Sequence, residues 1–406
     1  MVQIDRADAR VLGQRLIEAR KARGTTQQEA AAHLGCSRPT LIAIEKGTRP
    51  VKPDELIRLA AFYGRRLHEL VRPGAPTAAL EPHLRAAVDA SRGGEEELAA
   101  AIGKFQRFVD DYRELERIAG ARSLHAYPPE ERLPQRANLR HFAEHLAIRE
   151  RSRLQLGDQP VLNLRGVLEN SAGLHVFYGG LPSGIAGMYA FVADLGCCIF
   201  VNRKHPPERR RATLAHEYGH FFCDRHKPGI DYLQENGRRP INERFADAFA
   251  MSLLVPESGV RRQFLEVTAA TGDFQVADIC RLSNYYFVSV EAMALRLEDL
   301  GLIQRGTWNF LKEERFRPGR AKQELGLPSG GAGDEEAYPE RYKYLAVGGF
   351  CQGKISEGQL ARFLWCDRVT AREIVAACSS CPYVGPDGRR VLLEMPFGRS
   401  VLKSES

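Results

Sequence analysis

The chain has 406 residues and a net charge of +7, and 44% of its residues are hydrophobic and 27% charged. This composition excludes a wholly disordered protein, and the length favours two to four domains. The first ten residues contain four charged side chains and precede no apolar run, so we expect no secretory signal. Residues 170–193 lack charged side chains but are rich in glycine, which indicates strands and turns rather than a membrane span.

Positive charge is concentrated at the N-terminal end. Residues 1–75 contain 14 lysines and arginines against 8 acidic residues, so they carry +6 of the net charge of +7. Such a concentration is typical of a module that binds nucleic acid, although a basic helical domain of another kind would show it too. The nine cysteines have no regular spacing over most of the chain, which predicts reduced thiols in a cytoplasmic protein.

Hydrophobic periodicity changes along the chain and predicts an α+β protein. Helical spacing dominates residues 10–155 and 209–303, whereas short apolar runs typical of strands lie between 161 and 201. The predicted parts are an N-terminal all-α domain (1–75), a helical connector (76–135), a small mixed sheet with helices (136–310), a linker (311–340) and a helical C-terminal region (341–406).

The N-terminal domain contains two short helices separated by a tight turn. Thr26–Leu34 is expected to form the first, and Gly35 supplies the turn. Ser37 suits the N-cap of the second helix, in whose first turn Pro39 is tolerated, and Gly47 ends it. This order predicts a helix-turn-helix.

The segment TTQQEAAAHLGCSRPTLIAIEKGTRP resembles the Xre/Cro-type helix-turn-helix family, over roughly residues 12–70. The resemblance implies that Ser37–Glu45 is the recognition helix and that double-stranded DNA is the partner. Pro39 departs from the usual polar residue, so the target sequence cannot be read, and a domain that only dimerises is the alternative. The residues expected near bases or phosphates are Gln27, Ser37, Arg38, Thr40, Lys46 and Arg49.

A possible metal site begins at residues 215–221, AHEYGHF, inside a helical run. His216 and His220 are four residues apart, so they share one helix face and can bind the same zinc ion. Glu217 projects beside them and could take a proton from water, as hydrolysis requires. The bare H-E-x-x-H motif also arises by chance, so a third ligand is needed.

That third ligand is expected in the segment NERFAD, 23 residues further on. Glu243 and Asp247 lie one helical turn apart on a shared face. Glu243 could bind the metal while Asp247 holds the outer nitrogen of a ligand histidine. Three protein ligands leave a fourth position for water, the arrangement of a catalytic zinc. We therefore expect one Zn²⁺ per chain; two surface helices with ordinary charges are the alternative.

The HExxH…NExxxD arrangement is that of the thermolysin-like zinc peptidases. The segments VLNLRGVLENSAGLHVFY, CCIFVN, ERRRATLAHEYGHFF, NERFADAFAMSLLVP and VSVEAMALRLEDLGLI together resemble the ImmA/IrrE metallopeptidase family, over roughly residues 140–305. The resemblance implies that His216, His220 and Glu243 are zinc ligands and Glu217 the general base. It also implies that the strands before the active helix present an edge to an extended substrate.

The family resemblance implies a cytoplasmic zinc endopeptidase that cleaves a repressor or antitoxin in response to stress or DNA damage. No membrane contact is expected, and a homodimer is compatible because such helix-turn-helix modules read two half-sites. The alternative is a transcription regulator whose zinc domain senses a ligand or partner with little proteolysis. A third hypothesis has the helix-turn-helix deliver the protease to the operator of its substrate.

Several other residues are weaker candidates. Tyr232 and His226 lie between the two zinc helices and could stabilise a transition state, although exposed loop positions explain them as well. Cys223 could sense oxidation near the metal, but core packing explains it more simply. The C-terminal cysteines could hold a second metal, although reduced thiols are the simpler interpretation; they are Cys351, Cys366, Cys378 and Cys381.

Overall fold

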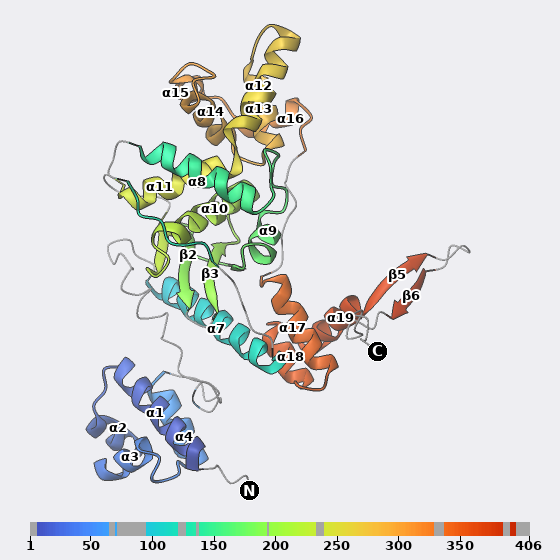
Figure 1. The fold of residues 1–406 in the computed structure, drawn as a ribbon. Coiled ribbons are helices and arrows are strands. Elements are labelled where there is room, and N and C mark those ends of the chain that lie inside the picture. The colour runs from blue at the N-terminus through green and yellow to red at the C-terminus, as the bar shows by residue number, and fades with distance from the viewer. Residues whose placement is uncertain are drawn as a thin grey trace, which may run out of the picture. The chain divides into compact units, whose positions relative to one another are not determined.

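The computed structural model divides into two compact units, Met1–Ala78 and Ala79–Ser406, drawn in Figure 1. Within the described residues, no helix is both long and apolar enough to cross a membrane. The residues described are 6–64, 70, 95–120, 127–134, 138–192, 195–232, 239–328, 337–384 and 390–394.

The first unit is a helical domain, and its helices begin and end at residue types that favour helix capping. Thr26 caps α2 through a reciprocal pair of hydrogen bonds with Glu29, and Gly35 ends that helix in the left-handed conformation. Ser37 caps α3, as predicted, by accepting a hydrogen bond from the Thr40 amide. The helices are α1 (Arg6–Ala22), α2 (Gln27–Leu34), α3 (Arg38–Glu45) and α4 (Pro53–Phe62).

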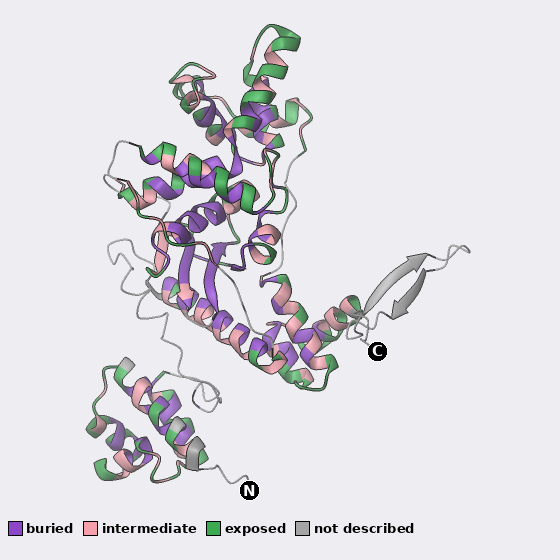
Figure 2. Cartoon of the chain, viewed as in Figure 1, coloured by how far each residue is buried: buried purple, intermediate pink, exposed green. Residues whose placement is uncertain are grey.

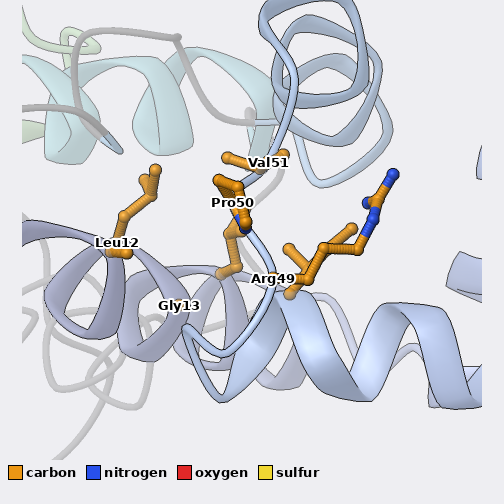
Figure 3. A pocket seen from close by; sticks show the side chains of 8 residues that line it. Leu12, Gly13, Arg49, Pro50 and Val51 are labelled. Atoms are coloured by element: carbon orange, nitrogen blue, oxygen red, sulfur yellow. The ribbon is translucent and has the colours of Figure 1, made fainter. Parts of the chain in front are cut away.

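Helices α1 and α3 approach each other closely. A Cβ atom at Gly13 would lie 2.3 Å from the Glu45 carbonyl oxygen, so only glycine permits this contact. A buried ion pair between Arg20 and Glu45, 2.6 Å long, joins the same two helices. The crevice that remains beside Gly13 and Leu12 measures only about 10 Å³, room for a single water molecule (Figure 3).

The second unit is built on a mixed four-stranded sheet. Strand β3 pairs parallel with β1 and antiparallel with β2, and β2 pairs antiparallel with β4. The strand order β1-β3-β2-β4 leaves β1 and β4 at the edges. This sheet beside many helices confirms the α+β class. The strands are β1 (His175–Gly179), β2 (Ile185–Val192), β3 (Gly196–Asn202) and β4 (Gly229–Tyr232).

Helices cover both faces of the sheet, and strands β1 and β3 are buried along their whole length (Figure 2). Alternate residues of β3 point to opposite sides: Ile199 joins one hydrophobic cluster, and Phe200 joins the other. The first cluster includes α8 (Leu139–Arg153), α10 (Pro207–Cys223) and α11 (Ile241–Leu254). The second includes α7 (Glu95–Ala119).

Helix α7 lies in the segment that the sequence indicated as a connector between domains. Its apolar stripe instead packs on the sheet, with Phe105 stacked on Phe200 at 5.4 Å and Phe108 stacked on Phe177 at 4.9 Å. A connector would leave these rings in water, so burial of their area explains why the helix joins the core.

The segment expected as a linker, 311–340, also contains ordered structure. It contains the end of α15 and the whole of α16; Leu311 belongs to the first cluster, and Phe316 and Leu325 pack against it. The remaining helices are α9 (Leu164–Asn170), α12 (Glu257–Thr271), α13 (Val276–Tyr285), α14 (Val290–Asp299), α15 (Thr307–Glu313), α16 (Pro318–Glu324), α17 (Glu340–Cys351), α18 (Glu357–Phe363) and α19 (Arg368–Ser379).

The C-terminal region is not purely helical. After α19 the chain forms an antiparallel hairpin of β5 (Ser380–Val384) and β6 (Arg390–Glu394). The residues between these strands read GPDGR, a turn-forming sequence that favours a hairpin between two apolar runs.

Candidate metal centre

Helix α10 presents the two histidines of the H-E-x-x-H motif on one face. Pro207 occupies its first turn, where the missing amide hydrogen costs nothing, and the helix runs without a break to Cys223. His216 and His220 are one turn apart, and their Nε2 atoms lie 3.1 Å from each other. Both side chains are largely buried, so the helix itself places two imidazole nitrogens at a common point.

Helix α11 adds a carboxylate to the two histidines. Glu243, in its first turn, places one carboxylate oxygen 3.3 Å from Nε2 of His216 and the other 3.3 Å from Nε2 of His220. Zinc bonds of 2.0–2.2 Å at the tetrahedral angle would separate ligand atoms by about 3.3–3.5 Å. Both distances from Glu243 match this spacing, and the 3.1 Å between the histidine nitrogens is slightly shorter, so the three donors have the chemistry of a zinc site and nearly its spacing.

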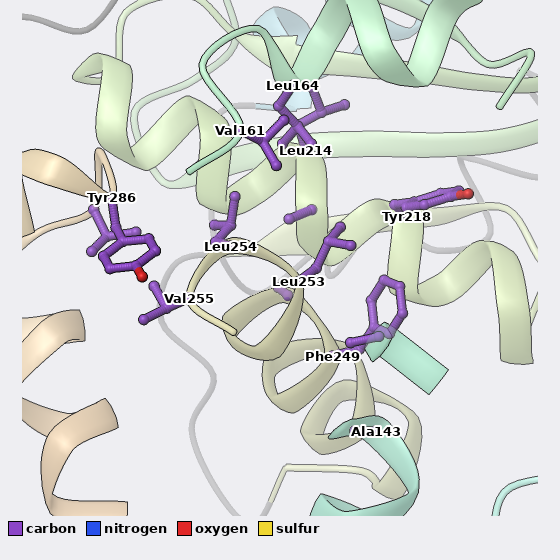
Figure 4. Packing of buried hydrophobic residues seen from close by; sticks show 14 of the residues in the cluster. Ala143, Val161, Leu164, Leu214, Tyr218, Phe249, Leu253, Leu254, Val255 and Tyr286 are labelled. Atoms are coloured by element: carbon purple, nitrogen blue, oxygen red, sulfur yellow. The ribbon is translucent and has the colours of Figure 1, made fainter. Parts of the chain in front are cut away.

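A glycine permits the approach of the two ligand-bearing helices. At Gly219 a Cβ atom would lie 2.8 Å from the Cα of Ala246 on α11, closer than carbon atoms can pack. Around this contact Tyr218 packs against Phe249 (Figure 4), and their ring centroids are 5.9 Å apart. The aromatic core thus fixes Glu243 relative to the histidines.

Carboxylates also face the outer nitrogens of both histidines. Oδ1 of Asp247 lies 3.0 Å from Nδ1 of His216, and its other oxygen pairs with Arg239. Burial opposes the charged imidazole, but hydrogen bonds to Asp247 and Glu243 outweigh it and raise the pKa of His216 to about 10. A proton held on Nδ1 leaves Nε2 available for a metal ion.

Asp224 plays the corresponding part for His220, and the sequence analysis missed it. Its Oδ2 lies 3.9 Å from Nδ1 of His220 and accepts a 2.8 Å hydrogen bond from Asn242, the residue before Glu243. Lys227 pairs with the other oxygen at 2.5 Å. The spacing in the sequence could have identified it, because Asp224 follows His220 by four residues, which is about one turn of a helix.

Glu217 is enclosed between α10 and the sheet. Its side chain is buried, and Oε1 has no hydrogen-bond partner within the described part of the chain. Burial raises the pKa of Glu217 to about 7, because the charged carboxylate loses its hydration. Gly187 of β2 provides the space, since a Cβ atom there would lie 3.1 Å from Oε1.

Strand β4 also contributes to the surroundings of the site. Asp231 is paired with Gly187 in the sheet, and burial raises the pKa of this carboxyl group. The sequence analysis missed Asp231 because its place depends on strand pairing. The sequence analysis expected a substrate edge on the strands before α10. Strand β1 is such an edge, whereas the edge strand next to Gly187 and Glu217 is β4, which follows α10.

Of the weaker candidates, Cys223 lies beside the donor His220, with its Sγ within 4.8 Å of a ring nitrogen of that histidine. His226 is exposed and packs edge-on against Phe191, whereas the side chain of Tyr232 is outside the described residues. Burial raises the pKa of Cys223, which disfavours the reactive thiolate. Among the described C-terminal residues, which include Cys351, Cys366 and Cys378, no group that could hold a metal ion is found, and the side chain of Cys381 is outside the description.

Two of the expected DNA contacts are engaged within the first unit. The amide of Gln27 donates a 2.8 Å hydrogen bond to Glu45 on α3. Arg49 donates to both carboxylate oxygens of Glu55, at 3.0 and 2.8 Å. The first contact joins α2 to α3, and the second joins the segment after α3 to α4.

The other expected contacts lie at or near the surface around α3. Arg38 and Lys46 are exposed at opposite ends of the helix. The hydroxyl groups of Ser37 and Thr40 lie 2.8 Å apart in its first turn. This arrangement leaves two positive side chains accessible to a phosphate backbone.

Comparison with known proteins agrees with this geometry. Residues 169–298, which include all three donors and Glu217, match the peptidase family model described as the IrrE N-terminal-like domain. Residues 16–70 match a helix-turn-helix model. The chain carries an IrrE-like domain behind a helix-turn-helix domain. The family resemblance inferred from sequence is thereby confirmed, and the IrrE-like domain has a metallopeptidase-type fold.

Two further comparisons add no functional evidence. The crystal structure of ComR from Streptococcus suis is 12% identical to this chain, covers 90% of it and 92% of its own length, and has a TM-score of 0.15. No conclusion about the IrrE-like domain follows from so low a score. A comparison with curated proteins finds no match.

Proposed function

We propose that the chain is a zinc-dependent endopeptidase that cleaves a transcriptional repressor or antitoxin in response to stress or DNA damage. The observation that supports this most strongly is Glu217. Its buried oxygen lacks a hydrogen-bond partner among the described residues, and it lies beside the donors His216, His220 and Glu243. Buried polar atoms are nearly always paired, so an unpaired one at a metal-type site supports a role in chemistry.

The metal ligands and Glu217 have separate roles in peptide hydrolysis. Zinc held by His216, His220 and Glu243 would polarise the scissile carbonyl and make a water molecule more acidic. Glu217 accepts the proton from the attacking water and returns it to the nitrogen of the leaving amine. Asp247 keeps His216 in the tautomer with a free Nε2.

An extended substrate would bind along β4. This strand is at the edge of the sheet, and its partner β2 contributes Gly187 next to Glu217. Edge strands have backbone amide and carbonyl groups free to pair with an added strand, which supplies affinity with little dependence on sequence. A repressor or antitoxin with an extended segment fits this requirement.

The helix-turn-helix domain couples this activity to double-stranded DNA. Arg38 and Lys46 provide the accessible positive charge around α3. A homodimer would read two half-sites. If the domain delivers the protease to the operator of its substrate, deletion of residues 1–75 should slow cleavage in cells but not in solution.

The test compares new protein N-termini in cells that express the wild type or Glu217→Gln, with and without DNA damage. A cut found only with the wild type would establish proteolysis and name the substrate. Glu208→Gln is the matched control, because Glu208 lies on the same helix and pairs with Lys322 rather than with the donors. Both variants should retain zinc, which is measured by metal analysis.

The regulator hypothesis predicts a different result. If the wild type and Glu217→Gln give the same N-termini, and both are folded and bind zinc, the proteolytic function is wrong. Transcription of the target genes should then respond equally to both proteins. The helix-turn-helix match is the observation that favours this second candidate.

A further inference from the structure

The C-terminal helices repeat the helix-turn-helix pattern of the first unit. Residues 355–374 read ISEGQLARFLWCDRVTAREI, and they align without a gap to residues 25–44, which read TTQQEAAAHLGCSRPTLIAI. The C-terminal segment forms α18 and the start of α19, and the N-terminal segment forms α2 and most of α3. The residues identical at this shift of 330 are Ala361, Leu364, Cys366, Arg368, Thr370 and Ile374 in the C-terminal segment. The chain thus contains the pattern twice.

The two helix pairs are also capped in the same way. Ser356 begins α18 through a reciprocal pair of hydrogen bonds with Gln359, the same capping box that begins α2. Asp367 begins α19 by accepting hydrogen bonds from the amide and the hydroxyl group of Thr370, both 2.9 Å long. Ser37 caps α3 from the equivalent position. The same local interactions therefore set the start of each helix.

The turn between the helices has the same backbone conformation in both pairs. Gly35 has a φ of 72°, and Trp365, at the equivalent position, has a φ of 55°. This left-handed region is unfavourable for a large side chain, so the surrounding packing holds the turn rather than the residue type. Leu364 and Ala371, on either side of the turn, are buried like their counterparts in the first unit.

Helix α17 completes a three-helix arrangement. It packs against both α18 and α19 (Figure 1), and the hydroxyl group of Tyr342 donates a 2.8 Å hydrogen bond to the carbonyl oxygen of Phe363 in α18. Tyr342 and Phe363 also belong to the hydrophobic cluster that includes α7. The three helices are therefore anchored in the core of the second unit.

One face of α19 is exposed over its first two turns. Val369 keeps 64% of its surface exposed, and the other exposed residues of this face are Arg368, Arg372 and Glu373. Arg372 pairs at 2.9 Å with Glu357 of α18, whereas Arg368 has no hydrogen-bond or ion-pair partner within the described residues. These side chains suit base-pair edges, because arginine donates to guanine, glutamate accepts from cytosine and an apolar group contacts the thymine methyl.

The charge along the chain follows the two helix pairs. Residues 341–406 contain 10 lysines and arginines against 6 acidic residues, a net charge of +4, whereas residues 76–340 carry −3. Residues 1–75 carry +6, so the two segments that contain the repeated pattern are the two positive parts of the chain. Such a distribution is typical of modules that bind nucleic acid.

Basic side chains also gather beside the turn of the C-terminal pair. Lys104 and Arg107 of α7 both lie over the ring of Trp365, 5.4 and 4.6 Å from its centroid. Burial and the neighbouring Arg107 and Arg203 lower the pKa of Lys104, because each disfavours a further positive charge there. Trp365 is two residues before the cap of α19, so these basic side chains lie near the N-terminal end of that helix.

We propose that α18 and α19 form a second helix-turn-helix that binds double-stranded DNA, with α19 as its recognition helix. The major groove admits an α-helix, whose N-terminal residues reach the base edges. Arg368, the counterpart of Arg38, contacts a phosphate group, and Val369 and Glu373 face the bases. DNA binding by α19 depends neither on proteolysis nor on the first unit, so it stands or falls separately from the proposed function.

The experiment uses the full-length protein to select DNA from a pool of random-sequence duplexes, and then measures affinity for the selected duplex at several salt concentrations. The test variants are Arg368→Ala and Glu373→Gln, which change exposed side chains. Arg317→Ala is the matched control, because Arg317 is exposed between α15 and α16, outside the repeated pattern. Circular dichroism and the thermal unfolding midpoint verify that each variant is folded.

We expect Arg368→Ala to weaken binding about 10-fold and to reduce the slope of log affinity against log salt by about 1, whereas Arg317→Ala changes neither. Glu373→Gln should select a different base at one position, because glutamine pairs with adenine where glutamate accepts from cytosine. Either effect supports the proposal.

Two results would overturn this assignment: the wild type selects no duplex, or both folded test variants select the same DNA as Arg317→Ala and bind it with the same affinity and slope. If DNA binding is unchanged but Arg368→Ala alters the molar mass in light scattering, the C-terminal helix pair is a protein contact, and the DNA proposal is wrong.

Discussion

The contact at Gly219 allows a quantitative test of how the metal centre is held. In Gly219→Ala the new Cβ atom would lie 2.8 Å from the Cα of Ala246, whereas ordinary contact begins at 3.4 Å. Helices α10 and α11 must therefore separate by about 0.6 Å. Zinc sites tolerate deviations of only about 0.2 Å in ligand distances, so the variant should bind zinc more weakly.

The stability of this variant is best compared with that of Gly103→Ala. Gly103 lies within α7, and a Cβ atom there would meet nothing within 4 Å. Both changes gain about 1 kcal/mol of helix propensity, but only Gly219→Ala incurs an overpacking cost of about 1–3 kcal/mol. We expect the free energies of unfolding of the two variants to differ by that cost.

Denaturant unfolding and zinc competition with a chelator are the two assays. Gly103→Ala should bind zinc like the wild type and unfold at a higher denaturant concentration. The reasoning is refuted if Gly219→Ala matches Gly103→Ala in both stability and zinc affinity, because the two helices would then adapt to the methyl group without moving the donors.

Three other substitutions test separate parts of the structure. Asp247→Ala should lower zinc affinity about 10- to 100-fold in chelator competition, since His216 loses its orienting partner; an unchanged affinity would contradict that role. Glu45→Ala leaves the buried Arg20 without its carboxylate, so the first unit should lose about 3–5 kcal/mol in denaturant unfolding, and a loss below 1 kcal/mol would show that the ion pair contributes little. Arg38→Ala should weaken DNA binding at all sequences and reduce the slope of log affinity against log salt by about 1, and an unchanged slope would remove Arg38 from the interface.

The sequence by itself determined the features that depend on local spacing. His220 follows His216 by four residues, about one helical turn, so the two imidazoles share a face wherever the helix is placed. The same local rule gives the N-cap at Ser37, because the capping hydrogen bond joins residues only three apart. The same rule of helical spacing could have identified Asp224, four residues after His220, as a partner of that histidine.

Only the tertiary structure decided which distant segments meet. Gly187 is 30 residues from Glu217, and no periodicity relates them, yet β2 brings them together. Helix α7 looked like a connector because an amphipathic pattern shows that a face is buried but does not say against what. A pocket of about 360 Å³ is likewise lined by three segments that lie between residues 162 and 343. Such contacts are set by the packing of whole surfaces, which the spacing of residues along one segment does not encode.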